Sequence, residues 1–461
     1  MKIVLLSGGS GKRLWPLSND IRSKQFLKLL KDPDGNYESM MQRVYRQIRS
    51  VSSDSEIIVA TVVSQMDSIK SQLGNHVDIV LEPERRDTFP AISLSCAYLR
   101  FEKQCALDEV VMVMPVDTYA DSDYFDVLVR MKQVVDNTKS DLVLMGINPV
   151  FASSKYGYIV PAKGKNNEMM VENAVPVSGF VEKPQENLAT KLIAKGAFWN
   201  GGVFAFKLGF LMGIIEGHLG NHGFSANSFD EVCSKYSSLE KTSFDYAVVE
   251  KAASISMIPY YGFWKDLGTW STLTDEMEDR FVGMVKTSRS TANTHIINEL
   301  SVPIIALGVK DMVIAASPDG ILVSDKEESA TLKDYVNDDY TRPMYEEKRW
   351  GNYKVLDYVQ YDNGTKSLTK HMVIQAGKGI SYQCHSARDE IWTITDGTGV
   401  ALIEDIARSV SKGDVLHIAK GQKHSIRADK TTDLHFIEVQ LGEDLVENDI
   451  LRFGETDVVE H

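Results

Sequence analysis

Apolar residues in the first 280 positions form short unbroken runs that alternate with segments of helical spacing. Valine and isoleucine are frequent in these runs, which are Ile57–Thr61, Val77–Leu81, Val110–Val116 and Leu142–Ile147. Short runs of this kind are typical of strands in a parallel sheet that helices cover on both faces. The pattern therefore predicts an α/β fold with a doubly wound, mostly parallel sheet.

Helical segments are expected between these runs. Apolar residues from Phe125 to Val135 recur at three- and four-residue spacings, and Asp121-Ser122-Asp123 offers N-cap residues just before them. Pro90 stands where a first helical turn would begin, ahead of Ala91–Cys105. We expect one helix at each of these two places.

The pattern changes near residue 284, where short apolar strands follow one another with turn residues between them. These strands are Val302–Leu307, Met312–Ala316 and Gly320–Val323. Helix signals stay weak until Ser329–Tyr335, and the acidic and polar stretch from Asp334 to Lys348 is typical of a linker. This part of the chain is predicted to be a β-rich connector.

The chain of 461 residues is too long for one ordinary hydrophobic core, so two or three domains are expected. We predict an α/β domain at 1–283, the connector and linker at 284–340, and a further domain at 341–461. Hydrophobic residues make up 43% of the chain and charged residues 25%, as in soluble globular proteins.

Charge and composition argue against several classes of function. The formal net charge of −14 argues against nucleic acid as a partner. The apolar run Ile3–Leu6 is too short for a signal peptide and no 18-residue apolar stretch exists, so we expect neither secretion nor a membrane partner. Four scattered cysteines without a Cys-x-x-Cys pair favour reduced thiols and a cytoplasmic location.

A candidate phosphate-binding loop follows the first apolar run. The run breaks into Ser7-Gly8-Gly9-Ser10-Gly11-Lys12-Arg13, and Lys24 follows eleven residues after Arg13. Glycines allow a tight turn and bring backbone N–H groups close to an anion, while Arg13 and Lys24 supply positive charge. The alternative is a glycine-rich turn that binds no ligand.

Two familiar phosphate loops do not fit this spacing. A Walker-type loop requires serine or threonine after Gly-Lys, but Arg13 follows Gly11-Lys12. A dinucleotide fingerprint requires a third glycine where Leu14 stands, and Trp15-Pro16 interrupts the helix that should begin there. Neither of these two loop types therefore accounts for the pattern, and the alternative of a turn without a ligand stays open at this point.

The pattern Gly-Gly-x-Gly-x-Arg-Leu-x-Pro-Leu, with Lys24 after it, resembles the opening of the sugar-1-phosphate nucleotidyltransferases. The resemblance implies a Mg²⁺ ion held by two carboxylates, here Asp117 at the end of an apolar strand and Asp266 in Trp264–Trp270. Taken alone, Asp117 could be an ordinary cap or turn residue, and Asp266 an exposed turn residue. Thr118 departs from the family, which usually has histidine after the first aspartate.

Further segments resemble the mannose-1-phosphate guanylyltransferase branch of this family. Glu82–Ala91 resembles its base-recognition segment, with Asp87 where asparagine is usual, and Phe180–Pro184 resembles its Phe-Val-Glu-Lys-Pro motif. Three more segments match, namely Tyr156–Ile159, Trp199–Gly202 and Ser243–Ala247. The substrate-binding residues that the resemblance implies are Gly8, Gly9, Gly11, Glu82, Arg86, Thr88, Gly157, Glu182 and Asn200.

In this branch a phosphate oxygen of mannose-1-phosphate attacks the α-phosphorus of GTP and expels pyrophosphate, so both compounds are the expected substrates. The resemblance implies that Arg13 and Lys24 neutralise the leaving pyrophosphate and that Lys183 holds the sugar phosphate. Lys183 could otherwise be a solvated surface lysine, the commoner environment for this residue type. The implied catalytic residues are Arg13, Lys24, Asp117, Lys183 and Asp266. The family also implies that the connector is a left-handed β-helix.

The last 120 residues contain six of the ten histidines. Gly379–Gly397 and Gly413–His424 resemble the two motifs of a cupin β-barrel. The resemblance implies one divalent metal, for which a nitrogen and oxygen donor set would suit zinc. Its implied ligands are Gln383, His385, Glu390 and His424. The alternative is a metal-free barrel kept as a structural or dimerising module, and in the dimerising case a homodimer is expected.

In bifunctional members of the branch the cupin is a mannose-6-phosphate isomerase. Here Ser386, Ala387 and Ile391 replace three histidines of its motif, and the family's terminal Tyr-Gly-Arg is missing after Arg452. Isomerisation needs a proton shuttle and an anchor for the sugar phosphate. We therefore expect an active guanylyltransferase with a weak or absent isomerase. The alternatives are a fully bifunctional enzyme and a non-catalytic nucleotide-sugar sensor, which the intact set of charged residues disfavours.

Overall fold

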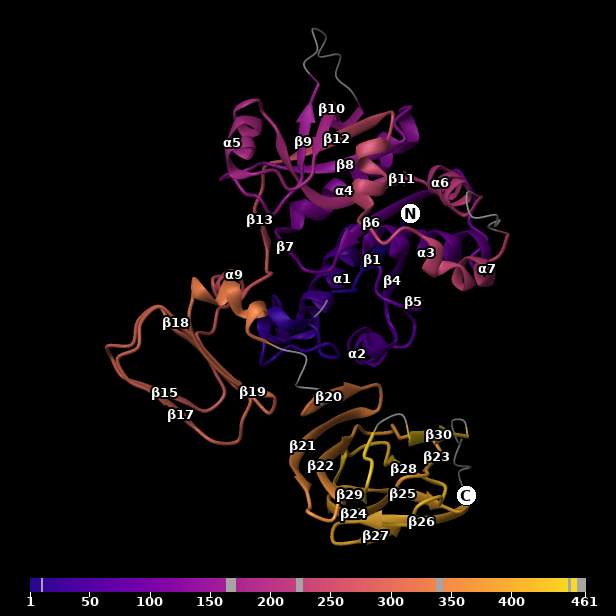
Figure 1. The fold of residues 1–461 in the computed structure, drawn as a ribbon, viewed down its shortest axis with the longest axis vertical. Coiled ribbons are helices and arrows are strands. Elements are labelled where there is room, and N and C mark those ends of the chain that lie inside the picture. The colour runs from indigo at the N-terminus through magenta and orange to yellow at the C-terminus, as the bar shows by residue number, and fades with distance from the viewer. Residues whose placement is uncertain (10, 163–170, 221–226, 337–342, 447–448, 454–461) are drawn as a thin grey trace. The chain divides into compact units, whose positions relative to one another are not determined.

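The computed structural model describes residues 1–461 except 10, 163–170, 221–226, 337–342, 447–448 and 454–461. The chain packs into two units (Figure 1). The first unit contains Met1–Arg13, Ser23–Met66 and Gln72–Glu278, and the second contains Leu14–Arg22, Asp67–Ser71 and Asp279–His461. All four cysteines are free thiols.

The first unit is built on a nine-stranded sheet with the order β5-β4-β1-β6-β11-β8-β12-β10-β9. Its strands are β1 (Lys2–Leu6), β4 (Glu56–Val62), β5 (Asp78–Glu82), β6 (Val110–Pro115), β8 (Leu142–Ile147), β9 (Tyr158–Pro161), β10 (Val175–Val181), β11 (Phe198–Lys207) and β12 (Ile255–Tyr260). Parallel pairs join β1 to β4 and β6, β4 to β5, and β8 to β12, whereas β11 runs antiparallel between β6 and β8. β10 is antiparallel to β12 and β9, and β9 is antiparallel to β11, so parallel pairing is found in β5-β4-β1-β6 and in β8-β12. The predicted α/β sheet is confirmed, and the four predicted strands end within one residue of the observed ones.

Both faces of this sheet are buried. Val111 and Val113 of β6 pack into one hydrophobic cluster with residues of α3 and α6, and the alternating Met112 and Met114 are also fully buried. Because successive strand side chains point to opposite faces, the second pair is covered from the other side, where α4 contacts β6. This double burial explains why the strands have unbroken apolar sequences.

The two helices that sequence spacing predicts, α3 and α4, form at the expected places, with differences at their ends. The α-helices of the structure are α1 (Met40–Val51), α2 (Met66–Leu73), α3 (Thr88–Phe101), α4 (Ser122–Asn137), α5 (Glu186–Ala194), α6 (Leu208–Gly220), α7 (Phe229–Ser234), α8 (Phe244–Ala247) and α9 (Trp270–Thr274). Asp121 is the N-cap residue of α4, as predicted. The prediction that the preceding helix reaches Cys105 is wrong, because α3 ends at Phe101 and Gln104 adopts a left-handed φ of 54°.

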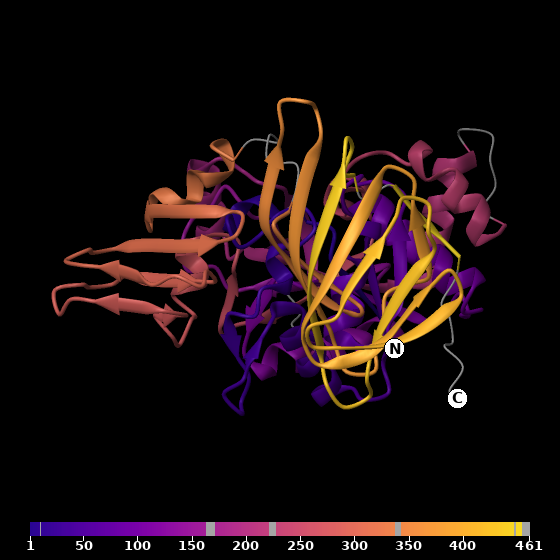
Figure 2. The same cartoon turned by 90° about the horizontal axis from the view of Figure 1, so that it is seen from below.

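The connector consists of short strands that stack in parallel (Figure 2). They are β14 (Phe281–Val282), β15 (Val285–Thr287), β16 (His295–Asn298), β17 (Ile304–Ala306), β18 (Met312–Ser317) and β19 (Gly320–Asp325). β16 pairs in parallel with β14 and β18, β15 pairs in parallel with β17, and β19 returns antiparallel to β18. The β-rich connector is confirmed, and its left-handed coiling stays a prediction.

Two sheets form the C-terminal cupin barrel, shown in orange and yellow in Figure 2. One has the order β20-β21-β22-β29-β24-β27 and the other β26-β25-β28-β23-β30. The strands are β20 (Tyr345–Lys348), β21 (Gly351–Gln360), β22 (Lys366–Ile374), β23 (Gln383–His385), β24 (Arg388–Asp396), β25 (Thr398–Ile403), β26 (Ile406–Ser411), β27 (Val415–Ile418), β28 (His424–Ala428), β29 (Leu434–Gly442) and β30 (Ile450–Arg452). Trp392 and Phe436 are fully buried in the core between the sheets.

Candidate active site

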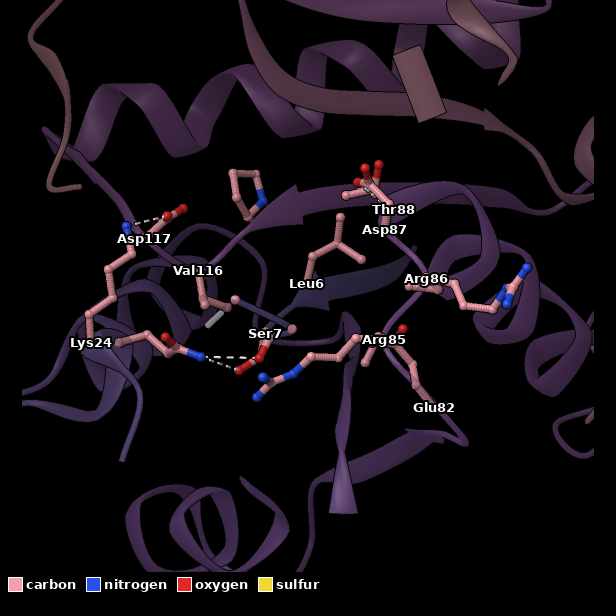
Figure 3. A pocket seen from close by; sticks show the side chains of 16 residues that line it. Leu6, Ser7, Lys24, Glu82, Arg85, Arg86, Asp87, Thr88, Val116 and Asp117 are labelled. Carbon is pink, nitrogen blue, oxygen red and sulfur yellow. Dashed lines mark hydrogen bonds and ion pairs between the residues drawn. The ribbon is translucent and has the colours of Figure 1, made fainter. Parts of the chain in front are cut away.

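A pocket of about 280 Å³ lies at the carboxyl ends of β1 and β6 (Figure 3). Open α/β sheets bind ligands at this edge. The sequence-predicted residues that line the pocket are Gly8, Gly9, Lys24, Glu82, Arg86, Thr88 and Asp117. Gly11 and Arg13 lie in the short 3-10 helix η1 (Gly11–Leu14), which follows the loop.

Buried amide side chains hold the glycine loop from inside. Nε2 of Gln25 donates to the carbonyl and hydroxyl oxygens of Ser7, both at 3.1 Å. Nε2 of Gln65 donates to Oγ of Ser23 at 2.7 Å, and this hydroxyl donates to the carbonyl oxygen of Gly9 at 3.2 Å. Because these loop oxygens bond inward, the loop can direct N–H groups toward an anion in the pocket.

Gly8 lies in a close approach to a side chain and has no unusual backbone conformation. Neither Gly8 nor Gly9 has a positive φ, so the tight turn expected from the sequence is not the reason for these glycines. A Cβ atom at Gly8 would lie 3.1 Å from Oε1 of Glu82, whereas one at Gly9 would meet no atom within 4 Å. Burial raises the pKa of Glu82, which accepts a hydrogen bond from the hydroxyl of Tyr236 at 2.7 Å.

A two-stranded ladder brings the two predicted Mg²⁺ ligands together. β7 (Thr118–Ala120) pairs antiparallel with β13 (Trp264–Asp266), which places Asp266 opposite the residue that follows Asp117. Nζ of Lys24 lies 2.8 Å from Oδ2 of Asp117 and 3.9 Å from Oδ1 of Asp266. One ammonium group therefore lies beside both carboxylates.

The two carboxylates have different proton affinities. Burial acts to raise the pKa of Asp117, but the charge and hydrogen bond of Lys24, a backbone hydrogen bond and the charge of Arg13 together lower it. Burial and the charge of Asp117 raise the pKa of Asp266, against the opposing effect of Lys24. Mg²⁺ prefers carboxylate oxygens, so two adjacent carboxylates that repel each other fit this ion.

Arg13 lies beside the same carboxylate pair. A Cβ atom at Gly268 would be 3.2 Å from Oδ2 of Asp266 and 3.5 Å from Nη1 of Arg13. The Arg13 charge also acts to lower the pKa of both Asp117 and Asp266. The predicted catalytic residues Arg13, Lys24, Asp117 and Asp266 are thus close neighbours in the structure.

A second cluster surrounds the residues predicted to bind the sugar. Nζ of Lys183 lies 2.8 Å from Oε1 of Glu182, whose side chain is only 5% exposed. Among the described residues, no group bonds to Oε2 of Glu182, which is buried. A Cβ atom at Gly157 would collide with this oxygen, so glycine keeps the space open. A buried acceptor without a donor is a place where a ligand hydroxyl can bind.

Asn200 holds an acidic residue that the sequence analysis did not select. Nδ2 of Asn200 donates to Oδ1 of Asp245 at 2.6 Å, and Oδ1 of Asn200 accepts from the backbone N of Gly202 at 3.1 Å. Burial and the charge of Glu182 raise the pKa of Asp245 to about 7. Asp245 belongs to the matched segment Ser243–Ala247, which was the only signal that pointed to it.

The two arginines after Glu82 extend in opposite directions (Figure 3). Arg86 donates from Nη1 to Oε1 of Glu84 at 3.0 Å and from Nη2 to the carbonyl oxygen of Leu239 at 3.1 Å. Arg85 extends toward Ser7 across the pocket. The resemblance selected Arg86, which occupies the arginine position of the base-recognition segment, and did not select Arg85.

Thr88 connects the base segment to the segment that carries Asp245. Its hydroxyl oxygen accepts from the backbone N of Phe244 at 2.8 Å, while its own backbone N donates to Oδ1 of Asp87 at 2.7 Å. Asp87 is the N-cap of α3 and has φ 72° and ψ −175°, a conformation that is costly for any residue except glycine. This strained residue stands where the branch usually has asparagine.

A family model for nucleotidyl transferases matches residues 2–280, more than half of the chain. The chain belongs to the nucleotidyl transferase family. A second model, for the C-terminal region of mannose-6-phosphate isomerase, matches residues 337–455. The predicted family and the predicted order of transferase and cupin regions are thereby confirmed.

Relatives of this nucleotidyl transferase align with it over nearly their whole length. Mannose-1-phosphate guanylyltransferase 2 of Escherichia coli O157:H7 is 27% identical, with 97% of this chain and 96% of the relative aligned. Mannose-1-phosphate guanylyltransferase RfbM of Salmonella typhimurium strain LT2 is 29% identical, with 97% and 96% aligned. A crystal structure from Thermus thermophilus, described as a mannose-1-phosphate geranyltransferase, is 28% identical with a TM-score of 0.59, and the match covers 72% of this chain and 97% of that one.

None of the helices in the described part of this nucleotidyl transferase combines the length and apolarity needed to cross a membrane.

The cupin of this nucleotidyl transferase contains a buried group of metal-ligating side chains. His385, Glu390 and His424 each offer one ligand atom, and these atoms lie within 4.8 Å of one another. They come from β23, β24 and β28, three strands of the two sheets. Gln383, the fourth predicted ligand, pairs with His424 across β23 and β28, and its Oε1 accepts from the hydroxyl of Ser381 at 3.1 Å.

Hydrogen bonds at Nδ1 of His385 and His424 leave the Nε2 atom of each ring unprotonated and facing Glu390. Burial lowers the pKa of His385 to about 4 and lowers that of His424, so both rings are neutral near pH 7. Nδ1 of His424 lies 3.0 Å from the carbonyl oxygen of Gln422, and Nδ1 of His385 lies 3.3 Å from the carbonyl oxygen of Asp449. Because a carbonyl oxygen can only accept, Nδ1 carries the proton in both rings. Both Nε2 atoms therefore present lone pairs near Glu390, and that of His424 is buried with no hydrogen-bond partner among the described residues. The Arg388 side chain already contacts two of these three groups, because its Nε donates to Oε1 of Glu390 at 3.0 Å and its Nη2 lies 3.3 Å from Nε2 of His385. The donor set suits a divalent cation, which would take the place of the Arg388 guanidinium at His385 and Glu390.

Proposed function

We propose that the protein transfers a guanylyl group from GTP to mannose-1-phosphate, releasing GDP-mannose and pyrophosphate. The observation that carries this proposal is the grouping of Lys24 and Arg13 around Asp117 and Asp266 at the edge of the pocket. The names of the full-length relatives support guanine as the base and mannose as the sugar.

This reaction requires no nucleophile from the protein. The phosphate of mannose-1-phosphate is already ionised at neutral pH and can attack the α-phosphorus directly. The barrier lies in bringing two polyanions together in line and in stabilising the charge that develops. Positioned cations and carboxylates are therefore the parts that the protein must supply.

Asp117 and Asp266 would hold Mg²⁺, which when bound supplies charge stabilisation at the reacting phosphates. Lys24 and Arg13 would donate to the β- and γ-phosphates that leave as pyrophosphate. A hydrogen bond to a charged group contributes about 1.5–3 kcal/mol net, so loss of either cation should be costly. Lys24 would exchange its present partner Asp117 for a phosphate oxygen when substrate and metal bind.

The sugar phosphate would bind at the second cluster. Lys183 would contact its phosphate, and the free Oε2 of Glu182 would accept a sugar hydroxyl. Asn200 already donates to Asp245, which suggests that it orders the acidic side of this pocket as well as contacting substrate. Hydroxyl recognition by buried acceptors discriminates strongly among sugars.

Pyrophosphate release by the full-length protein tests the proposal. The assay should compare GTP with ATP, UTP and CTP, and mannose-1-phosphate with glucose-1-phosphate, in the presence of Mg²⁺. We expect the highest kcat/KM for GTP with mannose-1-phosphate and no turnover in EDTA. A preference for another base or sugar would contradict the specificity, and the absence of turnover with every pair would contradict the activity.

Isomerisation of mannose-6-phosphate is a second candidate function, favoured by the buried triad of His385, Glu390 and His424. We propose that this activity is weak or absent, with zinc bound by the triad. Where the isomerase motif has histidines, the backbone N atoms of Ser386 and Ala387 donate to the carboxylate of Asp449 at 3.0 and 2.8 Å. Neither side chain offers the imidazole that could move a proton.

An assay of the full-length protein with added zinc tests this second proposal. We expect about one equivalent of bound zinc, a higher unfolding temperature when it is present, and little conversion of mannose-6-phosphate to fructose-6-phosphate. His424→Gln should abolish zinc binding, whereas His435→Gln, on the outer part of the barrel sheet, should not. Rapid isomerisation would contradict a weak isomerase, and unchanged zinc content in His424→Gln would contradict the ligand assignment.

A further inference from the structure

The segment Leu14–Arg22 joins two predicted catalytic residues but packs with a different part of the chain. Arg13 precedes it, and Lys24 follows two residues after its end. These flanking residues belong to the first unit, whereas Leu14–Arg22 belongs to the second. All the contacts of this segment described below lie within the second unit.

The first half of the segment is held by the turn between β18 and β19. The hydroxyl of Ser317 donates to the carbonyl oxygen of Pro16 at 2.7 Å. A Cβ atom at Gly320 would lie 2.5 Å from the ring of Trp15, so glycine is required for the indole to pack there. Nδ2 of Asn19 donates to Oδ2 of Asp319 at 2.9 Å.

The second half is held by a two-point ion pair. Nη1 and Nη2 of Arg22 donate to Oε2 and Oε1 of Glu299 at 2.8 and 2.9 Å. The two side chains are 17% and 27% exposed, and the Arg22 guanidinium lies 4.9 Å from the centre of the Tyr345 ring. Such a fork-to-fork pair fixes direction as well as distance, and partial burial limits screening by water.

A hydrogen-bonded turn connects the Arg22–Glu299 ion pair to the contact between Asn19 and Asp319. Oδ1 of Asn19 accepts from the backbone N atoms of Ile21 and Arg22 at 3.0 and 2.7 Å, and the backbone N of Asn19 donates to the carbonyl oxygen of Arg22 at 3.0 Å. These three hydrogen bonds therefore tie Asn19 to Arg22 within one turn. Only Ser23 separates Arg22 from the 3-10 helix η2 (Lys24–Phe26).

We propose that Arg22 and Glu299 are a positioning pair for nucleotidyl transfer. The pair touches no predicted substrate site among the described residues, and it acts by fixing the end of the segment from which Lys24 extends. This inference rests on the proposed function, in which the Lys24 ammonium must meet the leaving pyrophosphate. A misplacement of about 1 Å at such a group can cost on the order of 10²-fold in rate.

Substitutions on both sides of the ion pair test the proposal. The variants are Arg22→Ala, Glu299→Ala, the double variant, and the exchanged pair Arg22→Glu with Glu299→Arg, all in the full-length protein. Asp311→Asn is the matched control, because Asp311 is a connector carboxylate whose described side-chain contact is with Nδ2 of Asn293, at 2.7 Å, rather than with the segment. The readouts are kcat and KM for each substrate, the Kd for GTP, and the unfolding temperature.

We expect each single variant to lower kcat about 10- to 100-fold, with KM for mannose-1-phosphate nearly unchanged. The double variant should be no worse than either single variant, and the exchanged pair should recover part of the loss. A merely structural role would instead lower the unfolding temperature without this pattern in kcat. Rates equal to those of Asp311→Asn, or additive losses in the double variant, would overturn the proposal.

Failure of the proposed function would give a different result. If the unaltered protein releases no pyrophosphate from any substrate pair, the function is wrong, and the Kd for GTP then tests the positioning pair. We expect Arg22→Ala and Glu299→Ala to weaken GTP binding several-fold relative to Asp311→Asn. Equal GTP affinities in all three variants would overturn the inference on its own.

Discussion

Single acidic residues in this protein differ in protonation because their immediate neighbours differ. Asp117 has an ammonium group 2.8 Å away, which lowers its pKa. Asp245 is bonded to the neutral amide of Asn200 and lies near the carboxylate of Glu182, and burial raises its pKa to about 7. The sequence displays the same residue type at both positions, so only the neighbours distinguish them.

The raised pKa of Asp245 predicts a pH-dependent effect on stability. The folded protein holds a proton on this carboxyl group up to about pH 7, whereas the unfolded chain releases it near the ordinary value of 3.8. The folded state therefore loses relative stability as the pH rises from about 4 to 7. Asp245→Asn keeps an oxygen that accepts from Asn200 and removes the ionisable group.

We expect Asp245→Asn to be more stable than the unaltered protein at pH 8, by an amount on the order of 1–3 kcal/mol, and to show no such gain at pH 4. Urea unfolding at several pH values measures the difference. Asp230→Asn, at an exposed position of α7, is the control. A gain that does not depend on pH would contradict the assignment.

At the scale of elements, the catalytic pair depends on a short ladder between distant parts of the sequence. β7 follows directly after Asp117, β13 ends at Asp266, and their antiparallel pairing makes the two carboxylates neighbours. A strand of three residues has almost no periodic signal, so sequence patterns predict neither strand. The resemblance selected both aspartates, and the ladder supplies the physical reason that they can act together.

This arrangement predicts that the catalytic charges can be removed without unfolding the protein. The side chains of Asp117 and Asp266 are 34% and 36% exposed. The side chain of Lys24, which lines the pocket, is 12% exposed. We expect Lys24→Ala and Asp266→Ala to lower kcat/KM by orders of magnitude while near-native circular dichroism is kept. Lys286→Ala, in β15, serves as a control for loss of a surface charge. Near-normal turnover in either catalytic variant would disprove its assigned role.

At the scale of the whole molecule, the predicted order of an α/β domain, a β-rich connector and a cupin is confirmed. The predicted limits at residues 283 and 340 stay predictions. The segment Leu14–Arg22 packs with the second unit, whereas the residues on both sides of it pack with the first. No sequence pattern indicates this arrangement. Sequence patterns divide a chain into consecutive pieces, and this segment is an exception to that division.

The sequence by itself determined the four apolar strands predicted in the α/β domain, the family and the residue types of the site. Strands buried on both faces need unbroken apolar runs, and a phosphate loop needs glycines and cations at fixed spacings, so both are visible along the chain. Only the tertiary structure decided that Arg85 extends toward Ser7, that Asn200 donates to Asp245, and that Arg22 pairs with Glu299. Side-chain direction and long-range pairing depend on atoms far apart in the sequence, and a linear pattern contains no information about their distances.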